Sequence, residues 1–312
     1  MIKIFFDTNL IQGQMFSTNG SFKEYSLSDF TLNRKIDKVV ELINEMGIKN
    51  FTSLIIPEIV IDEIRQHKIE TFRVHQKEFK NTCEKYKQIF GNGIKINFSQ
   101  LQSEPEYVQI LDNSIKKYIK DNSLNFKIAK LNIDLNHIKN KVINKELMFT
   151  SAKGENEKIF TDAGFKDNLI LETLIQESNF NSDMVVLFSR DSDFDKASGQ
   201  YKFKRIDDIE SLKSYILENN KEAKIIHLLK SLNSADNKMN IAGYCKDHNA
   251  SSIIDDSIVV DKLLDNDILI DEELNECVTS AKVKKGNKNY IIKISFNLDD
   301  YSVIDAQEVK QC

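Results

Sequence analysis

The chain opens with MIKIFFDTN (residues 1–9), and this stretch decides the fold. Its apolar part is short, β-branched and aromatic, which is typical of a buried strand. It runs directly into Asp7, Thr8 and Asn9, which are residues of a strand end. A carboxylate beside a buried edge is costly unless it is paired or bound to a cation. Asp7 therefore predicts a polar site where the first strand ends.

Helix and strand patterns alternate after this first strand. Apolar residues at helical spacing predict helices over 31–47, from Pro57 to Gly91, over 166–178 and over 206–218. Two further apolar runs predict strands, FTSLII at 51–56 and MVVLFS at 184–189. The alternation predicts an α/β fold in which helices cover both faces of a parallel sheet, a Rossmann-like three-layer arrangement.

The helix that begins at Pro57 is unusually long and leads into a helical insertion over about 65–153. One stripe of this helix carries apolar or neutral residues: Ile61, Ile64, Phe72, His75, Phe79, Cys83, Tyr86 and Phe90. We expect His75 and Cys83, which lie on this stripe, to be core residues without a catalytic role. Three further elements are predicted in the insertion: a strand at 93–98 and helices near 105–121 and 134–148.

Charge is unevenly distributed along the 312 residues, whose net charge is −5. Residues 63–153 contain 17 basic against 10 acidic side chains, whereas residues 255–312 contain 7 against 13. A basic helical section is more often a solvated surface than a binding site. Beside an acidic site, however, the Lys and Arg side chains of 65–153 are suited to holding a nucleic acid backbone.

The pattern changes near residue 220, and we expect domains at 1–220 and 221–312. In the second, KEAKIIHLLKSL predicts a helix and KVKKGNKNYIIKISFNL predicts two strands joined by a turn, so this is a small α+β accessory domain. The N-terminal apolar run is too short for a signal peptide, and no stretch reaches the roughly 20 apolar residues of a membrane span. We therefore expect a cytoplasmic protein without a membrane partner.

Four acidic motifs stand at the ends of predicted elements: FFDTN at 5–9, IDEI at 61–64, FKDN at 165–168 and SRDSDF at 189–194. Asp7 and Asp191 follow parallel strands, so their side chains should converge at one sheet edge. Asp167 shares the apolar face of its helix, and Glu63 is preferred to Asp62 because it points toward the sheet. Asp7, Asp167 and Asp191 would each be explained, if taken alone, as a cap or turn residue, but the arrival of all the acids at one edge favours a shared site.

The motifs contain many carboxylates and no histidine. Such oxygen ligands suit hard divalent cations, Mg²⁺ or Mn²⁺, rather than zinc. Two such ions, about 4 Å apart, can activate a water and stabilise both oxygens of an in-line displacement. The predicted chemistry is therefore metal-dependent hydrolysis of a phosphodiester.

In this order, the four motifs resemble those of PIN-domain ribonucleases, over roughly residues 1–200. The resemblance implies a PIN-like nuclease core with catalytic, metal-binding acids at Asp7, Glu63, Asp167 and Asp191. It further implies a supporting set: Asp193 as an additional metal ligand, Asn9 and Ser189 as residues that orient the carboxylates, and Asp162 as a weaker candidate. Ser189 stands where threonine is usual. The helical insertion is similar to that of larger bacterial PIN-like proteins.

The resemblance implies an endoribonuclease that acts on RNA such as tRNA or mRNA, as a toxin or defence effector. A structure-specific DNA nuclease and a catalytically silent scaffold that binds RNA or protein remain alternatives. An aspartyl-phosphate phosphatase would also start from an Asp after the first strand, but it usually needs a second acid where Asn9 stands. The acidic C-terminal part is a candidate for autoinhibition, for binding a regulatory protein partner or for self-association.

Overall fold

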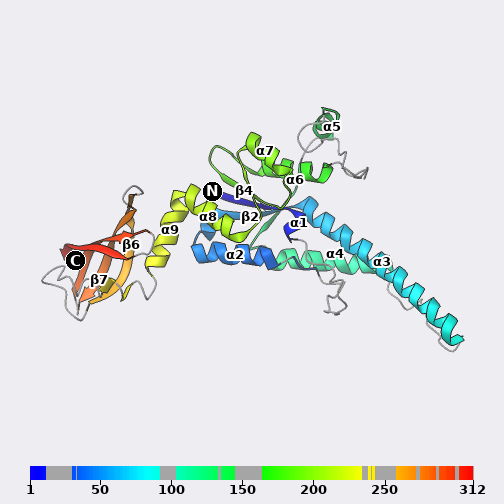
Figure 1. Cartoon of the computed structure of the whole chain (residues 1–312), viewed down its shortest axis with the longest axis horizontal. Helices are drawn as coiled ribbons and strands as arrows, with labels where there is room; N and C mark the ends of the chain where they lie inside the picture. Colours follow the sequence, from blue (N-terminus) through cyan, green and yellow to red (C-terminus); the bar gives the residue numbers. More distant parts are fainter. Residues whose placement is uncertain are drawn as a thin grey trace. The chain divides into compact units, whose positions relative to one another are not determined.

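The computed structural model describes residues 1–11, 30–32, 34–91, 103–132, 135–144, 164–233, 238–239, 241–242, 258–271, 275–285, 288–298 and 302–311 (Figure 1). The chain divides into two compact units. One comprises Met1–Ile43 and Lys49–Ser214, and the other comprises Asn44–Ile48 and Tyr215–Cys312. The separate roles predicted for 1–220 and 221–312 stay predictions.

A five-stranded parallel sheet forms the centre of the first unit. Its strands are β1 (Ile2–Phe6), β2 (Thr52–Pro57), β3 (Lys127–Ala129), β4 (Met184–Phe188) and β5 (Lys204–Ile206). They are ordered β3-β2-β1-β4-β5, and every neighbouring pair is parallel. This confirms the predicted α/β fold. The three-residue edge strands β3 and β5 were not predicted, because so short a run shows no periodicity.

Helices cover both faces of this sheet. Figure 1 shows α2 and α4 on one side and α6 and α7 on the other. These helices are α2 (Arg34–Met46), α4 (Glu104–Asp121), α6 (Phe165–Glu177) and α7 (Phe194–Tyr201). Further helices are α1 (Thr8–Ile11), the short 3-10 helix η1 (Lys49–Phe51) and α8 (Ile209–Asn219). The predicted helices over 31–47, 166–178 and 206–218 are thus confirmed. The chain leaves α2 through Gly47, whose φ of 76° favours glycine.

The order of the strands reverses between β1 and β4, which makes this pair the topological switch point of the sheet. After β1 the chain moves to β2 on one side, and after β4 it moves to β5 on the other. In parallel α/β sheets, ligands bind beyond the carboxyl ends of the strands where the order reverses in this way. β1 ends at Phe6 and β4 ends at Phe188, directly before Asp7 and Ser189. The fold therefore brings two of the acidic motifs to this switch point.

The long helix α3 (Glu58–Phe90) packs against α4 only near its start. Arg65 pairs with Asp112 at 2.6 Å, and Arg73 pairs with Glu104 at 2.6 Å, so the two helices are antiparallel. Glu104 is the first residue of α4, and α4 therefore does not cover α3 beyond Arg73. The outer half of α3 extends past α4 (Figure 1).

This geometry corrects the predicted stripe. Phe79, Tyr86 and Phe90, which lie past the point at which α4 begins, are 46%, 50% and 61% exposed. The expectation that His75 is a core residue is also wrong, since its side chain is 41% exposed. Cys83 is buried, as expected.

The sequence marks the beginning of α4 clearly. Ser103 and Glu106 form a capping box, in which the Ser103 side chain accepts from the Glu106 N–H and the Glu106 carboxylate accepts from the Ser103 N–H. The Phe72 ring of α3 stacks on Tyr107 with a centroid distance of 4.2 Å. The predicted helix near 105–121 is confirmed, while the predicted strand at 93–98 lies outside the described residues.

Helix α5 (Leu135–Asn144) connects the insertion to the sheet domain through a buried ion pair. Lys141 of α5 binds Glu172 of α6, and both side chains are less than a tenth exposed. His137 Nε2 lies 3.5 Å from the other oxygen of Glu172. Losing one partner of such a pair would leave a buried charge, so this contact holds α5 on α6.

The second unit combines helix α9 (Lys221–Leu232) with an antiparallel sheet. Its strands, in the order β6-β7-β8-β9, are β6 (Ile258–Asp271), β7 (Glu276–Lys285), β8 (Lys288–Asn297) and β9 (Val303–Gln311). Leu228 and Leu232 of α9 belong to one buried cluster with Val283, Ile294 and Phe296 of the sheet. β7 and β8 are the predicted strand pair, whereas β6 and β9 were not predicted.

None of the helices in the described ranges combines the length and the apolar character needed to cross a membrane.

Candidate active site

Asp7 lies at the carboxyl end of β1 and is 5% exposed. Its N–H donates to the Phe188 carbonyl at 3.1 Å, which extends the pairing of β1 with β4 by one residue. Ser189, fully buried at the end of β4, donates its hydroxyl to Asp7 Oδ2 at 2.6 Å. The two strand ends thus hold the Asp7 carboxylate in one orientation.

The surroundings of Asp7 make its ionisation costly. Burial is the largest influence and raises the pKa of Asp7 to about 6, against the lowering effect of hydrogen bonds from the Ser189 hydroxyl and the Thr8 backbone. The negative charges of Asp191 and Glu63 also raise this pKa. Asp191 and Glu63 are therefore each near enough to repel Asp7, and a positive charge close to Asp7 would be stabilising.

The loop after β4 positions the fourth motif. The N–H of Asp191 donates to Ser189 Oγ at 3.0 Å, and the N–H of Asp193 donates to Asp191 Oδ1 at 2.9 Å. Asn9 contacts the same loop, because its Oδ1 accepts from the Arg190 N–H at 3.2 Å and its Nδ2 donates to Ser189 Oγ at 3.5 Å. Asp193 is exposed. Asn9 and Ser189 thus contact the ends of both strands, and their role in orienting the carboxylates stays a prediction.

Glu63 approaches from the second turn of α3. Thr8 Oγ1 donates to its Oε2 at 2.7 Å, and Lys166 Nζ donates to its Oε1 at 2.9 Å. His67 Nε2 lies 3.9 Å from the same Oε1. Asp62, the neighbouring acid, is exposed. The structure thus directs Glu63, rather than Asp62, to the residue that follows Asp7.

Asp167 stands in the first turn of α6, directly after Lys166, and is half-buried. The helix begins after Gly164, whose φ of 77° lies in the left-handed region. Asp167 is therefore the neighbour in sequence of Lys166, whose ammonium binds Glu63. Asp162 lies outside the described residues.

These side chains suit a divalent cation in kind, because all the candidate ligands are carboxylate oxygens. The cost of burying the charged Asp7 is one that a bound cation would offset. Within the described part of the chain, no three His, Cys, Asp or Glu side chains already form a group that could hold one ion.

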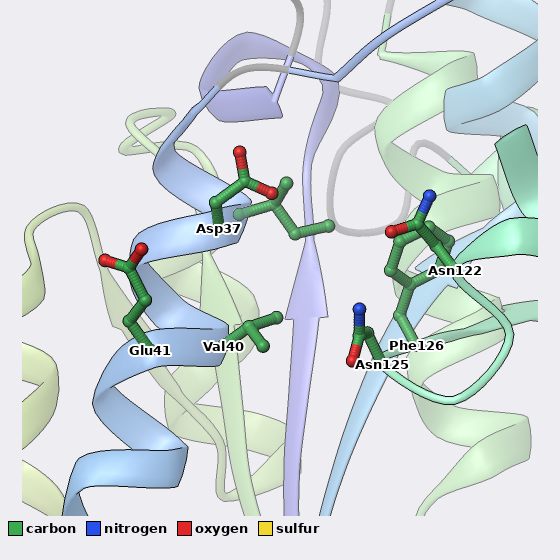
Figure 2. Close-up of a pocket in the computed structure, with 7 residues that line it drawn as sticks. Asp37, Val40, Glu41, Asn122, Asn125 and Phe126 are labelled. Carbon is green, nitrogen blue, oxygen red and sulfur yellow. The ribbon is translucent and has the colours of Figure 1, made fainter.

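A small pocket in the same unit lies away from these acids. It has a volume of about 150 Å³ and lies between α2 and the turn that follows α4. Figure 2 shows Asp37 and Glu41 of α2 on one side and Asn122, Asn125 and Phe126 on the other. None of the candidate acids lines it.

Several basic side chains of the insertion form ion pairs, and several others are exposed. Arg65, Arg73 and Lys141 pair with acids of neighbouring helices and so help to hold the insertion together. A second group is exposed on the outer half of α3: Lys77, Lys80 and Lys85.

Comparison with known families identifies the fold. The family model described as PIN domain matches residues 4–194, which include every candidate acid. The chain belongs to the PIN-domain family. PIN domains are generally nucleases, so the family implies a nucleic acid substrate, and they typically use divalent metals such as Mg²⁺. No curated protein matches the chain.

Two contacts of this PIN domain were not predicted. Thr8 was read as a strand-end residue only, and Lys166 was given no role, although both bind Glu63. The position of Lys166 beside Asp167 was the available signal. Its partner lies 103 residues away in the chain, so no local pattern reveals the contact.

Proposed function

We propose that this PIN-domain protein is a divalent-metal-dependent endoribonuclease that hydrolyses RNA phosphodiester bonds. The observation that carries the proposal is the buried Asp7 carboxylate at the switch point between β1 and β4, with Asp191 and Glu63 close enough to raise its pKa. A buried acid with costly ionisation among other acids is a common feature of catalytic sites. A role as a toxin or defence effector belongs to the same proposal and rests on the family resemblance alone.

We propose Asp7, Glu63, Asp167 and Asp191 as the residues that would hold the cations, with Asp193 in support. Mg²⁺ or Mn²⁺ is the expected cofactor, with two ions in the site. The chemistry that such ions supply when bound is activation of water and stabilisation of charge on the phosphodiester.

The protein's own groups have separate parts in this proposal. Asp7 must be ionised to act, and its pKa of about 6 leaves it mostly charged above neutral pH. The hydroxyl of Ser189 favours this charged form and fixes its direction. The backbone N–H groups of Asp191 and Asp193, held by Ser189 and Asp191, fix the loop that carries the last two acids.

The exposed lysines on the outer half of α3 are proposed to hold the RNA backbone, because phosphate contacts of this kind give affinity without reading sequence. This part of the proposal is separable from the chemistry. Replacing Lys77, Lys80 and Lys85 by Gln should weaken RNA binding and reduce its dependence on salt, with cleavage of bound RNA unchanged.

The decisive experiment is cleavage of labelled single-stranded RNA, tRNA and matched DNA in Mg²⁺, Mn²⁺ or EDTA. Wild type is compared with Asp7→Asn and Asp167→Asn, and Asp195→Asn serves as a control because Asp195 is exposed and pairs with Arg205. We expect RNA cleavage that needs the metal, is lost in both variants and persists in the control. Cleavage that survives in both variants would contradict the proposed site.

Two other outcomes would change the assignment. Cleavage of DNA in preference to RNA would indicate a structure-specific DNA nuclease. No cleavage of any substrate, together with RNA binding, would indicate a silent scaffold.

A further inference from the structure

The contact between Lys166 and Glu63 has a role beyond packing, and the inference about it rests on the proposed metal-dependent function. Lys166 Nζ lies 2.9 Å from Glu63 Oε1. The Glu63 side chain is 16% exposed and the Lys166 side chain 38% exposed, so water screens this ion pair only in part. This ion pair connects the acidic motif at 61–64 with the one at 165–168.

Both oxygens of Glu63 are already engaged. Oε2 accepts from the hydroxyl of Thr8, and Oε1 accepts from the ammonium of Lys166. Thr8 is adjacent to Asp7, and Lys166 is adjacent to Asp167. Glu63 is therefore held between the two elements that carry the neighbouring acids, and its charge is neutralised from the side of α6.

A divalent cation on Glu63 would compete with this arrangement. A carboxylate oxygen that accepts from an ammonium has less charge to offer a metal ion, and the ammonium would repel that ion at a few ångströms. Within the described residues, the acids also do not form a ready group for one ion. Cation binding must therefore change what Glu63 contacts.

We propose that Lys166 is a resident counter-ion of Glu63, which a divalent cation must displace in order to bind. Lys166 neutralises Glu63 while the site holds no cation and gives up Oε1 when the ion enters. The displaced ammonium stays beside Asp167, where, as a mobile point charge, it is suited to hold a phosphate oxygen of the substrate. The same side chain thus sets the cation affinity and then contacts the RNA.

The test measures Mn²⁺ binding to the full chain by calorimetry and electron paramagnetic resonance, without any substrate. Lys166→Gln should bind Mn²⁺ about tenfold more tightly than wild type, because the competing positive charge is gone. Lys166→Arg keeps the charge and should bind as wild type does. Unchanged or weaker binding in a folded Lys166→Gln protein, shown by an unaltered unfolding transition, would overturn the proposal.

A double-mutant cycle separates the specific pair from general electrostatics. In a Glu63→Gln background, Lys166→Gln should no longer tighten Mn²⁺ binding, because the counter-ion has lost its partner. An equal gain in both backgrounds would overturn the proposal. Binding in neither wild type nor Lys166→Gln would overturn it as well.

A kinetic readout tests the second half of the proposal. Lys166→Gln should raise KM for RNA about fivefold or more despite its tighter Mn²⁺ binding, because a phosphate contact is lost. An unchanged KM would overturn the phosphate contact. If wild type cleaves no RNA but Lys166→Gln still tightens Mn²⁺ binding, the proposed function fails while the counter-ion role stands. If wild type cleaves RNA but Lys166→Gln does not tighten Mn²⁺ binding, the proposed function stands and the counter-ion role fails.

Discussion

The two sides of the candidate active site hold their acids in different ways. On the strand side, burial at the end of β1 raises the pKa of Asp7 to about 6, although hydrogen bonds from the Ser189 hydroxyl and a backbone N–H lower it in part. On the helix side, Glu63 receives a hydroxyl from Thr8 and the full positive charge of Lys166. On the strand side the negative charge of Asp7 is costly, whereas on the helix side the negative charge of Glu63 is already balanced by Lys166.

In the proposed nuclease, this difference gives the two sides opposite effects on the affinity for a divalent cation. The cost of the charged Asp7 is one that a divalent cation offsets, so the strand side favours cation binding. The helix side must release an ammonium first, so it opposes binding until the exchange takes place. Variants on the two sides should therefore change cation affinity in opposite directions.

The largest expected effect is on the strand side. Asp7→Asn should reduce RNA cleavage about a thousandfold, because it removes the carboxylate at the centre of the proposed site. Cleavage is measured under single-turnover conditions in Mn²⁺. A loss of less than about tenfold would mean that Asp7 has no central part in the chemistry.

The same variant should stabilise the cation-free protein. The pKa of Asp7 is about 6 in the folded protein and 3.8 in the unfolded chain, so ionisation of Asp7 destabilises the folded protein at pH values above this range. Two units correspond to about 3 kcal/mol as an upper estimate. The gain in free energy of unfolding of Asp7→Asn over wild type, measured in EDTA, should be largest above pH 7, should shrink as pH falls from about 6 to about 4, and should vanish at lower pH. A gain that does not depend on pH would contradict this explanation.

A smaller effect is expected at Ser189, which favours the charged form of Asp7. Ser189→Ala removes that hydrogen bond, so the pKa of Asp7 rises further and a smaller fraction is ionised at neutral pH. Cleavage should fall about tenfold at pH 7 and recover in part at pH 8.5. Ser189→Thr, which keeps the hydroxyl, is the matched control. A loss that is equal at both pH values would show that the hydroxyl acts in another way.

A weaker effect is expected on the helix side, where Lys166 still neutralises Glu63. Thr8→Val removes the neutral donor to Glu63 and should slow cleavage about threefold, since the lost hydrogen bond is worth roughly 1 kcal/mol. Thr8→Ser should retain wild-type cleavage. A loss as large as that of Ser189→Ala would show that the two sides do not differ as described.

The smallest effect is expected at Asp195, an acid near the same sheet edge. Its side chain is 53% exposed and pairs with Arg205 at 2.7 Å. Asp195→Asn should change the free energy of unfolding by less than about 1 kcal/mol, as measured by urea titration. Cleavage should stay within about twofold of wild type. A large loss of cleavage would extend the site beyond the acids proposed for it.

Much of this PIN domain could be predicted from local sequence. MIKIFF and MVVLFS are continuous apolar runs with polar residues directly after them, so both strands and the acids at their ends were readable. The choice of Glu63 over Asp62 followed from the helical face. The edge strands β3 and β5 were not readable, because three residues show no period.

The sequence by itself therefore determined the parallel α/β core and which acids stand at the ends of its strands, because period and strand-end chemistry are properties of neighbouring residues. The tertiary structure alone decided three other matters. It ended the contact of α4 with α3 at Arg73, it buried Asp7 against Ser189, and it brought Lys166 to Glu63. These depend on groups up to 182 residues apart, and burial, pKa and ion pairing follow from distances in space, which no local pattern contains.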